Sequence, residues 1–113
     1  MIIQHKEYKC KVHFQKYQNN NNTAILLYGA PETDYEHELI TIATVNGDIT
    51  LPKNIVGIKT WSENEGIVQS LVDGNVIKPF LLGGEPTGYV VIEHYKLTEE
   101  ALKQMDKQQK ENS

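Results

Sequence analysis

Cysteine and histidine have the most versatile side-chain chemistry in this chain, and their spacing decides what they can do. Cys10 and His13 lie three positions apart, and a thiol beside an imidazole can act as a nucleophile. The surrounding residues alternate between apolar and polar, which predicts a strand, and residues three apart on a strand point to opposite faces. We therefore expect Cys10 to be a buried, unreactive thiol. The other histidines show no metal-ligand spacing, so neither a metal nor a cofactor is expected.

The glycine-rich segment 83–88, GGEPTG, has the composition of a loop that approaches a ligand closely. It lacks the Gly-Lys-Ser/Thr ending of a phosphate-binding loop, and it does not open a helix. The pattern therefore favours a mobile connection before the last strand. The alternative is a flap over a small ligand, formed by Gly83, Gly84 and Thr87.

The segment Trp61–Glu65, WSENE, places the only tryptophan beside two carboxylates and an amide. In the simpler interpretation, Trp61 fills the core where a helix begins and the acids favour the positive end of the helix dipole. In the functional interpretation, the group binds another protein, since an aromatic ring surrounded by polar groups is typical of hot spots. Glu63 and Glu65 point in different directions, which argues against a shared catalytic site. The candidate interaction residues are Trp61, Glu63, Asn64 and Glu65.

The segment 31–38, PETDYEHE, is an acidic loop. A solvated surface connection accounts for this composition, since most loops run over the surface. The alternative is a site for a metal or a cationic partner, with Asp34, Glu36 and His37 as possible ligands, although the spacing matches no compact metal motif. Glu32, Asp34 and Glu36 are the candidate residues of this loop for binding another protein.

The elements that position these groups follow from hydrophobic periodicity and turn residues. Residues 7–17 alternate, the Asn-rich turn 18–22 follows, and 23–28 returns as the second strand of a hairpin. Segment 39–45 is expected to be a central strand, and Asn46-Gly47 to form a tight hairpin turn. Strands that cluster early with short connections predict an α+β domain with one antiparallel sheet of four to five strands. The expected strands are 7–17, 23–28, 39–45, 55–60 and 89–95.

Two helices are expected. Ser62 and Glu65 have the spacing of a capping box, which predicts a central helix that ends at Gly74 in a left-handed C-cap. Thr98 is a suitable N-cap for a short C-terminal helix. That helix is expected to fray from Lys107 onward, so we predict a single domain over 1–106 and a polar tail over 107–113.

Charge is distributed unevenly along the 113 residues. The net charge is −4, but residues 31–100 alone carry twelve acids and four lysines, which is −8. No arginine is present, and arginine is the residue that reads guanine edges and grips phosphate, so nucleic-acid binding is disfavoured. A single cysteine fits a reducing compartment, and no apolar run is long enough to span a membrane, so a cytoplasmic protein is expected.

The segment 58–66, IKTWSENEG, followed by the helix end near Gly74 and by 86–90, PTGYV, resembles a family of small bacterial proteins of unknown function. Their genes lie largely on conjugative elements, plasmids and phages. The likeness extends over roughly residues 39–97, with ATVN at 43–46 and the Leu51-Pro52 step as further matches. It implies a compact single domain in a mobile-element accessory protein, and it carries over no catalytic residues.

These features together predict a non-enzymatic protein that binds and modulates another protein, such as a component of host defence. The alternative is a protein that binds or sequesters a small ligand, for example a nucleotide or a metabolite. A homodimer is compatible with either function.

Overall fold

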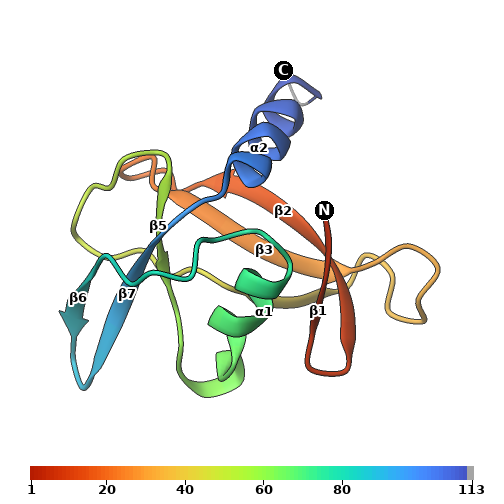
Figure 1. Cartoon of the computed structure of the whole chain (residues 1–113), viewed down its shortest axis with the longest axis horizontal. Coiled ribbons are helices and arrows are strands. Elements are labelled where there is room, and N and C mark those ends of the chain that lie inside the picture. The colour runs from red at the N-terminus through yellow and green to blue at the C-terminus, as the bar shows by residue number, and fades with distance from the viewer. Residues whose placement is uncertain (112–113) are drawn as a thin grey trace.

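The computed structural model describes residues 1–111, which form two antiparallel sheets and two α-helices (Figure 1). This agrees with the predicted α+β class. In chain order the elements are β1 (Ile2–His5), β2 (Tyr8–Lys16), β3 (Thr23–Gly29), β4 (Leu39–Ile42), β5 (Ile55–Ile58), the 3-10 turn η1 (Ser62–Asn64), α1 (Ile67–Asp73), β6 (Gly83–Thr87), β7 (Val90–Lys96) and α2 (Glu99–Glu111).

The first sheet has the order β1-β2-β3-β4. The alternation predicted for β2 is confirmed, because Cys10, Val12 and Phe14 are buried, while Lys11 is exposed and His13 is half-buried. β3 returns beside β2 as predicted. The sequence predicted a central strand at 39–45, but β4 lies at the edge of the first sheet. The chain crosses to the second sheet directly after it. The Lys59 N–H donates to the Ala43 carbonyl at 3.0 Å in this crossing.

The second sheet has the order β5-β7-β6, so the prediction of one sheet is wrong. Two tight turns add strands that the periodicity did not reveal. Lys6-Glu7 joins β1 to β2, with Lys6 at a φ of 53°. Gly88-Tyr89 joins β6 to β7, with Gly88 at a φ of 60° in the first central position, where a type II′ turn requires glycine. Segment 83–87 is therefore a strand and not the mobile connection that we expected.

The Asn46-Gly47 signal does not produce a hairpin, since no strand follows before β5. The loop is held by Glu85 of β6 instead. Its carboxylate accepts hydrogen bonds from the Asp48 N–H at 2.7 Å and from the Ile49 N–H at 3.3 Å. A long-range side-chain contact thus replaces the local turn.

Helix α1 begins later than predicted, and the expected capping box does not form. Ser62 has a left-handed φ of 60° and lies in η1, and the N-cap of α1 is Gly66 at a φ of 86° with no side-chain cap. At the other end Gly74 has an ordinary φ of −82°, and Asn75 takes the left-handed position. A side chain at Gly74 would lie 2.2 Å from Ile3 Cγ2, so glycine there permits close packing of α1 on β1.

Helix α2 begins as predicted, with the Ala101 N–H donating to Thr98 Oγ1 at 3.0 Å. It continues to Glu111, beyond the fraying expected from Lys107, and the rest of the predicted tail, 112–113, lies outside the described residues. Gln108 explains the extension. Its amide accepts from the Phe14 N–H at 2.8 Å and donates to the Val12 carbonyl at 3.2 Å, which closes the edge of β2 beyond the end of β1.

The core lies between the two sheets and the buried faces of both helices. From α1 it receives Ile67 and Leu71, and from α2 it receives Ala101 and Met105. Cys10 is fully buried as predicted, and burial raises the pKa of its thiol to about 11. Neither α-helix within residues 1–111 is long and apolar enough to cross a membrane.

Candidate functional site

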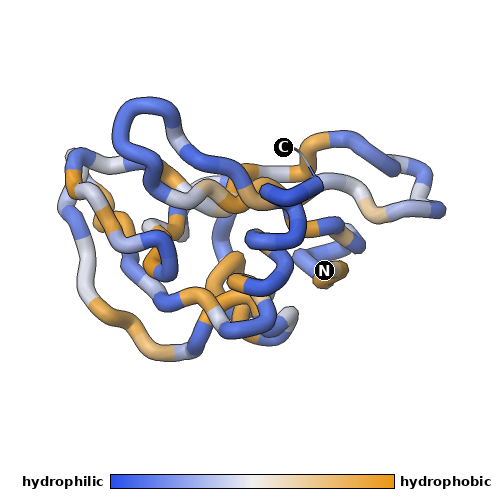
Figure 2. Tube along the Cα trace, turned by 90° about the horizontal axis from the view of Figure 1, so that it is seen from above, coloured by the Kyte–Doolittle hydropathy of each residue, from blue (hydrophilic) through white to orange (hydrophobic). Residues whose placement is uncertain are grey.

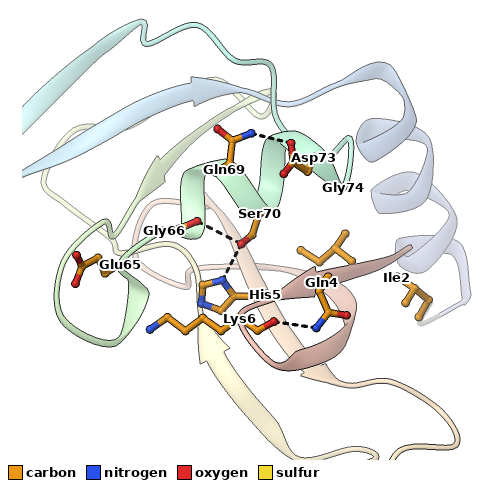
Figure 3. A pocket seen from close by; sticks show the side chains of 11 residues that line it. Ile2, Gln4, His5, Lys6, Glu65, Gly66, Gln69, Ser70, Asp73 and Gly74 are labelled. Carbon is orange, nitrogen blue, oxygen red and sulfur yellow. Dashed lines mark hydrogen bonds between the residues drawn. The ribbon is translucent and has the colours of Figure 1, made fainter.

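A groove of about 510 Å³ runs between β1 and α1 (Figure 3). The two elements run in opposite directions along it, as three contacts show. Ile3 lies under Gly74, His5 contacts Ser70, and the Lys6 ammonium donates to the Glu63 carbonyl at 3.1 Å. The groove is lined by Ile2, Ile3, Gln4, His5 and Lys6 from the strand side and by Glu65, Gly66, Gln69, Ser70, Asp73 and Gly74 from the helix side.

The backbone of β1 is open to this groove along its outer edge. The Val12 N–H donates to the Met1 carbonyl at 2.9 Å, so these two residues form a hydrogen-bonded pair of the antiparallel ladder. Because such pairs alternate with non-bonded ones, the N–H and C=O groups of Ile2 and Gln4 point away from β2. Within residues 1–111 no hydrogen bond reaches these outward groups. They are two donors and two acceptors in strand geometry.

The other sheet edges are covered or interrupted. At β4, the Asn64 side-chain amide donates to the Ile42 carbonyl at 2.9 Å. At β5, the Val45 N–H donates to the Gly57 carbonyl at 3.1 Å. β6 contains Pro86, which has no N–H to offer, and proline is a common means of protecting an edge strand. β1 therefore differs from the other edge strands in having two successive outward-facing residues, Ile2 and Gln4, whose N–H and C=O groups all lack a hydrogen bond within residues 1–111.

His5 and Ser70 form a polar contact under the groove. His5 is only 2% exposed, and its Nδ1 lies 2.8 Å from Ser70 Oγ, which is also 3.3 Å from the Gly66 carbonyl (Figure 3). The other ring nitrogen, Nε2, is buried without a hydrogen-bond partner among the described residues. Burial, with a smaller contribution from the Lys6 charge, lowers the His5 pKa, and Glu7 and the Glu63 carbonyl oppose this shift.

A serine within hydrogen-bonding distance of an imidazole is also the arrangement of a nucleophile and its base. Such a base is normally held in one tautomer by a third group on its other nitrogen. No side chain within 1–111 supplies that group to His5 Nε2. We therefore interpret the pair as a contact that joins β1 to α1.

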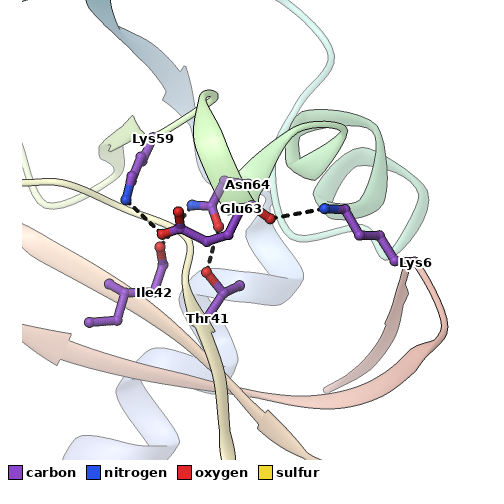
Figure 4. Close-up of polar contacts among 6 residues, drawn as sticks. All are labelled: Lys6, Thr41, Ile42, Lys59, Glu63 and Asn64. Carbon is purple, nitrogen blue, oxygen red and sulfur yellow. Dashed lines mark hydrogen bonds and ion pairs between the residues drawn. The ribbon is translucent and has the colours of Figure 1, made fainter.

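The turn before α1 forms one end of the groove and is fixed from below by Asn64 (Figure 4). Asn64 is completely buried; its Oδ1 accepts from the Thr41 hydroxyl and its Nδ2 donates to the Ile42 carbonyl. On the surface of the turn, Lys59 Nζ lies 2.6 Å from Glu63 Oε1. This hydrogen bond is the main reason why the Glu63 pKa falls to about 2.

These contacts divide the interaction residues predicted in this segment. Glu63 and Glu65 are exposed and Trp61 is half-buried, so all three can meet another molecule. Asn64 cannot, because its side chain is buried and both of its polar atoms are occupied. Its place in the sequence suggested a surface amide, and only the tertiary structure shows it as an anchor.

The remaining predicted site residues lie away from the groove. Glu32, Asp34 and Glu36 are exposed on the loop between β3 and β4, where Glu36 Oε2 lies 3.1 Å from His37 Nε2. Within the described chain no group of three or more metal-ligating side chains comes together. The proposed ligand flap of Gly83, Gly84 and Thr87 is instead strand β6, paired along its length with β7.

A hydrophobic surface near β6 is a second feature that sequence reasoning missed. Phe80, Leu81 and Leu82 are 70%, 60% and 53% exposed, and the neighbouring hairpin exposes Tyr89 and Val91. Figure 2 shows hydrophobic residues in the interior of the molecule and also along one stretch of the chain at its periphery. The run FLL was visible in the sequence, but three consecutive apolar residues predict a buried strand as readily as an exposed connection.

Comparison of the chain with protein-family models, with curated proteins and with solved structures gave no match. The resemblance to proteins of mobile elements therefore stays a prediction.

Proposed function

We propose that this chain is a protein-binding domain that accepts an extended segment of another protein as an added strand on β1. The free backbone groups of Ile2 and Gln4 are the observation that carries the proposal. Strand addition uses main-chain hydrogen bonds for affinity and flanking side chains for specificity. The groove beside α1 provides room for such a segment, and α1 provides the flanking side chains.

The contacts that hold α1 against β1 support this function. α1 is held to β1 by the buried His5–Ser70 contact and by the packing of Gly74 on Ile3. The turn at its other end is held by Asn64. A preformed groove reduces the entropy lost on binding. The interaction role predicted from the sequence is thus kept, while its interface moves from the Trp61 turn and the acidic loop to the edge of β1.

Peptide display followed by NMR tests the proposal. Extended peptides of about nine residues, long enough to cover the four residues of β1 with an overhang at both ends at ~3.3 Å per residue, are selected on the immobilised protein and then titrated into ¹⁵N-labelled protein. We expect the amide signals of Ile2 and Gln4 to shift with those of α1. If no peptide is selected, or if the shifts lie elsewhere, the proposal is wrong.

The substitution Gln4→Pro tests the edge directly, with Gln4→Thr as its matched control. The Gln4 N–H points away from β2, so proline removes an outward donor without breaking a ladder bond. We expect Gln4→Pro to weaken binding at least tenfold, about 1.4 kcal/mol, and Gln4→Thr to bind normally. Unchanged binding by folded Gln4→Pro would refute strand addition.

The same test can be made from the ligand if Gln4→Pro does not fold. A peptide methylated on one alternate set of amide nitrogens should lose binding, because those amides pair with β1. Methylation of the other set should have little effect. Equal binding by both methylated peptides would contradict the proposal.

A further inference from the structure

The charged side chains of the groove are arranged along α1 and not along β1. Glu65 precedes the helix, and its carboxylate has no hydrogen-bond or ion-pair partner within residues 1–111. Asp73 ends the helix and accepts one hydrogen bond, from Gln69 Nε2 at 2.7 Å. Among the described residues Lys6 is the one cation that lines the groove, and its ammonium donates to a neutral carbonyl and not to either carboxylate.

The distance between Glu65 and Asp73 along the groove matches the length of four residues in an extended strand. Seven helical steps separate Gly66 from Asp73, which is roughly 10.5 Å at 1.5 Å per residue, and the extended residue Glu65 adds about 2–3 Å. Four residues of a strand cover about 13 Å. Residues i, i+2 and i+4 of a strand lie on one face. Because α1 runs antiparallel to β1, a strand added to β1 would place residues i and i+4 near the two carboxylates.

We infer that the segment bound by this groove carries lysine or arginine at two positions four residues apart, with a small or polar residue midway between them. The inference rests on the proposed strand addition. The two basic side chains pair with Glu65 and Asp73, and the residue between them faces Gln69 and Ser70. Hydrogen bonds to Ile2 and Gln4 set the register, so a basic pair with odd spacing has one member on the far face of the added strand.

Four peptides of equal length and otherwise equal sequence test this inference. They carry lysines at i and i+4, lysines at i and i+3, glutamines at i and i+4, or glutamates at i and i+4. Fluorescence anisotropy gives their dissociation constants at low and at high salt. Two exposed ion pairs correspond to a gain of roughly two- to thirtyfold for the i, i+4 lysine peptide over the glutamine peptide. That gain should shrink at high salt, because exposed charges are screened.

Variants of the protein locate the effect. Glu65→Gln and Asp73→Asn should each reduce the preference for the i, i+4 lysine peptide about two- to fivefold, roughly the strength of one exposed ion pair. Both variants keep the shape of the side chain, and Asp73→Asn still accepts from Gln69. Glu100→Gln is the matched control, since Glu100 is an exposed acid of α2 that does not line the groove. This control should leave the preference unchanged.

The outcomes separate this inference from the proposed function. If the glutamine peptide or the i, i+3 lysine peptide binds as tightly as the i, i+4 lysine peptide, the basic motif is wrong and strand addition stands. If none of the four peptides binds, the proposed function itself fails.

Discussion

Asn64 is expected to be the most important polar residue for the stability of the turn that ends the groove. Its side chain joins the segment between β5 and α1 to β4, with one bond to the Thr41 hydroxyl and one to the Ile42 carbonyl. Asn64→Ala removes both of these hydrogen bonds at once. The substitution leaves a buried hydroxyl and a backbone carbonyl without their hydrogen bonds, and it opens a cavity.

The size of the effect follows from these two groups. A buried group that loses its hydrogen bond costs about 1–3 kcal/mol. The Thr41 hydroxyl can rotate, and the Ile42 carbonyl lies in a partly exposed residue, so both costs should fall in the lower half of that range. We expect a loss of about 2–4 kcal/mol in the free energy of unfolding. At about 4 °C per kcal/mol for a domain of this size, the melting temperature should fall by roughly 8–16 °C.

Urea unfolding followed by circular dichroism measures the loss, and calorimetry checks the melting temperature. Gln18→Ala is the control, because it removes an exposed amide that makes no side-chain hydrogen bond within residues 1–111 and should change stability by less than about 0.5 kcal/mol. Thr41→Val completes a double-mutant cycle that should show a coupling of about 0.5–2 kcal/mol with Asn64→Ala. A loss no larger than that of the control would refute the role of Asn64 as an anchor.

Three further predictions concern other parts of the fold. Gln108→Ala should lower the free energy of unfolding, measured with urea, by about 1–3 kcal/mol, because the half-buried Phe14 N–H and the Val12 carbonyl lose their partner. Gln109→Ala, on the exposed side of α2, is the control. Burial lowers the His5 pKa below the ordinary 6.5, so the unfolded chain binds the proton more readily than the folded chain. The free energy of unfolding should therefore decrease as the pH falls through 6.5. A His5→Gln variant whose stability depends on pH as that of the unsubstituted protein does would contradict this. Cys10 should react with iodoacetamide at pH 8 only at the rate of unfolding, since its pKa is about 11 in the folded state; fast labelling under native conditions would show that the thiol is accessible.

The strands with clear alternation could be predicted from the sequence, because one buried face imposes a period of two over enough residues. β2 is the example, and the buried Ile92 and His94 give β7 the same period over part of its length. β3 is buried at six of its seven positions and could be predicted instead as a short apolar run that follows a turn. β1 could not be predicted, because it has four residues and a Lys-Glu turn with none of the usual hairpin residues. β6 could have been found from Gly88, whose position before Tyr89 is the sequence signal of a type II′ turn.

The errors at α1 have a common physical cause, because tertiary contacts overrode local capping preferences. Asn64 is buried and hydrogen-bonded to Thr41 and Ile42, and Ser62 and Gly66 on either side of it have left-handed backbone conformations before the helix begins. No local pattern contains that information. The groove was equally hidden, because His5 and Ser70 are 65 residues apart in the sequence and meet only in the folded chain.

The most direct test of the central claim is the titration of ¹⁵N-labelled protein with the i, i+4 lysine peptide. Strand addition to β1 predicts shifts of the Ile2 and Gln4 amides, together with slower hydrogen exchange at both as they gain partners. Shifts confined to Phe80–Leu82 and the β6–β7 hairpin, with Ile2 and Gln4 unchanged, would contradict it and would move the interface to the hydrophobic surface.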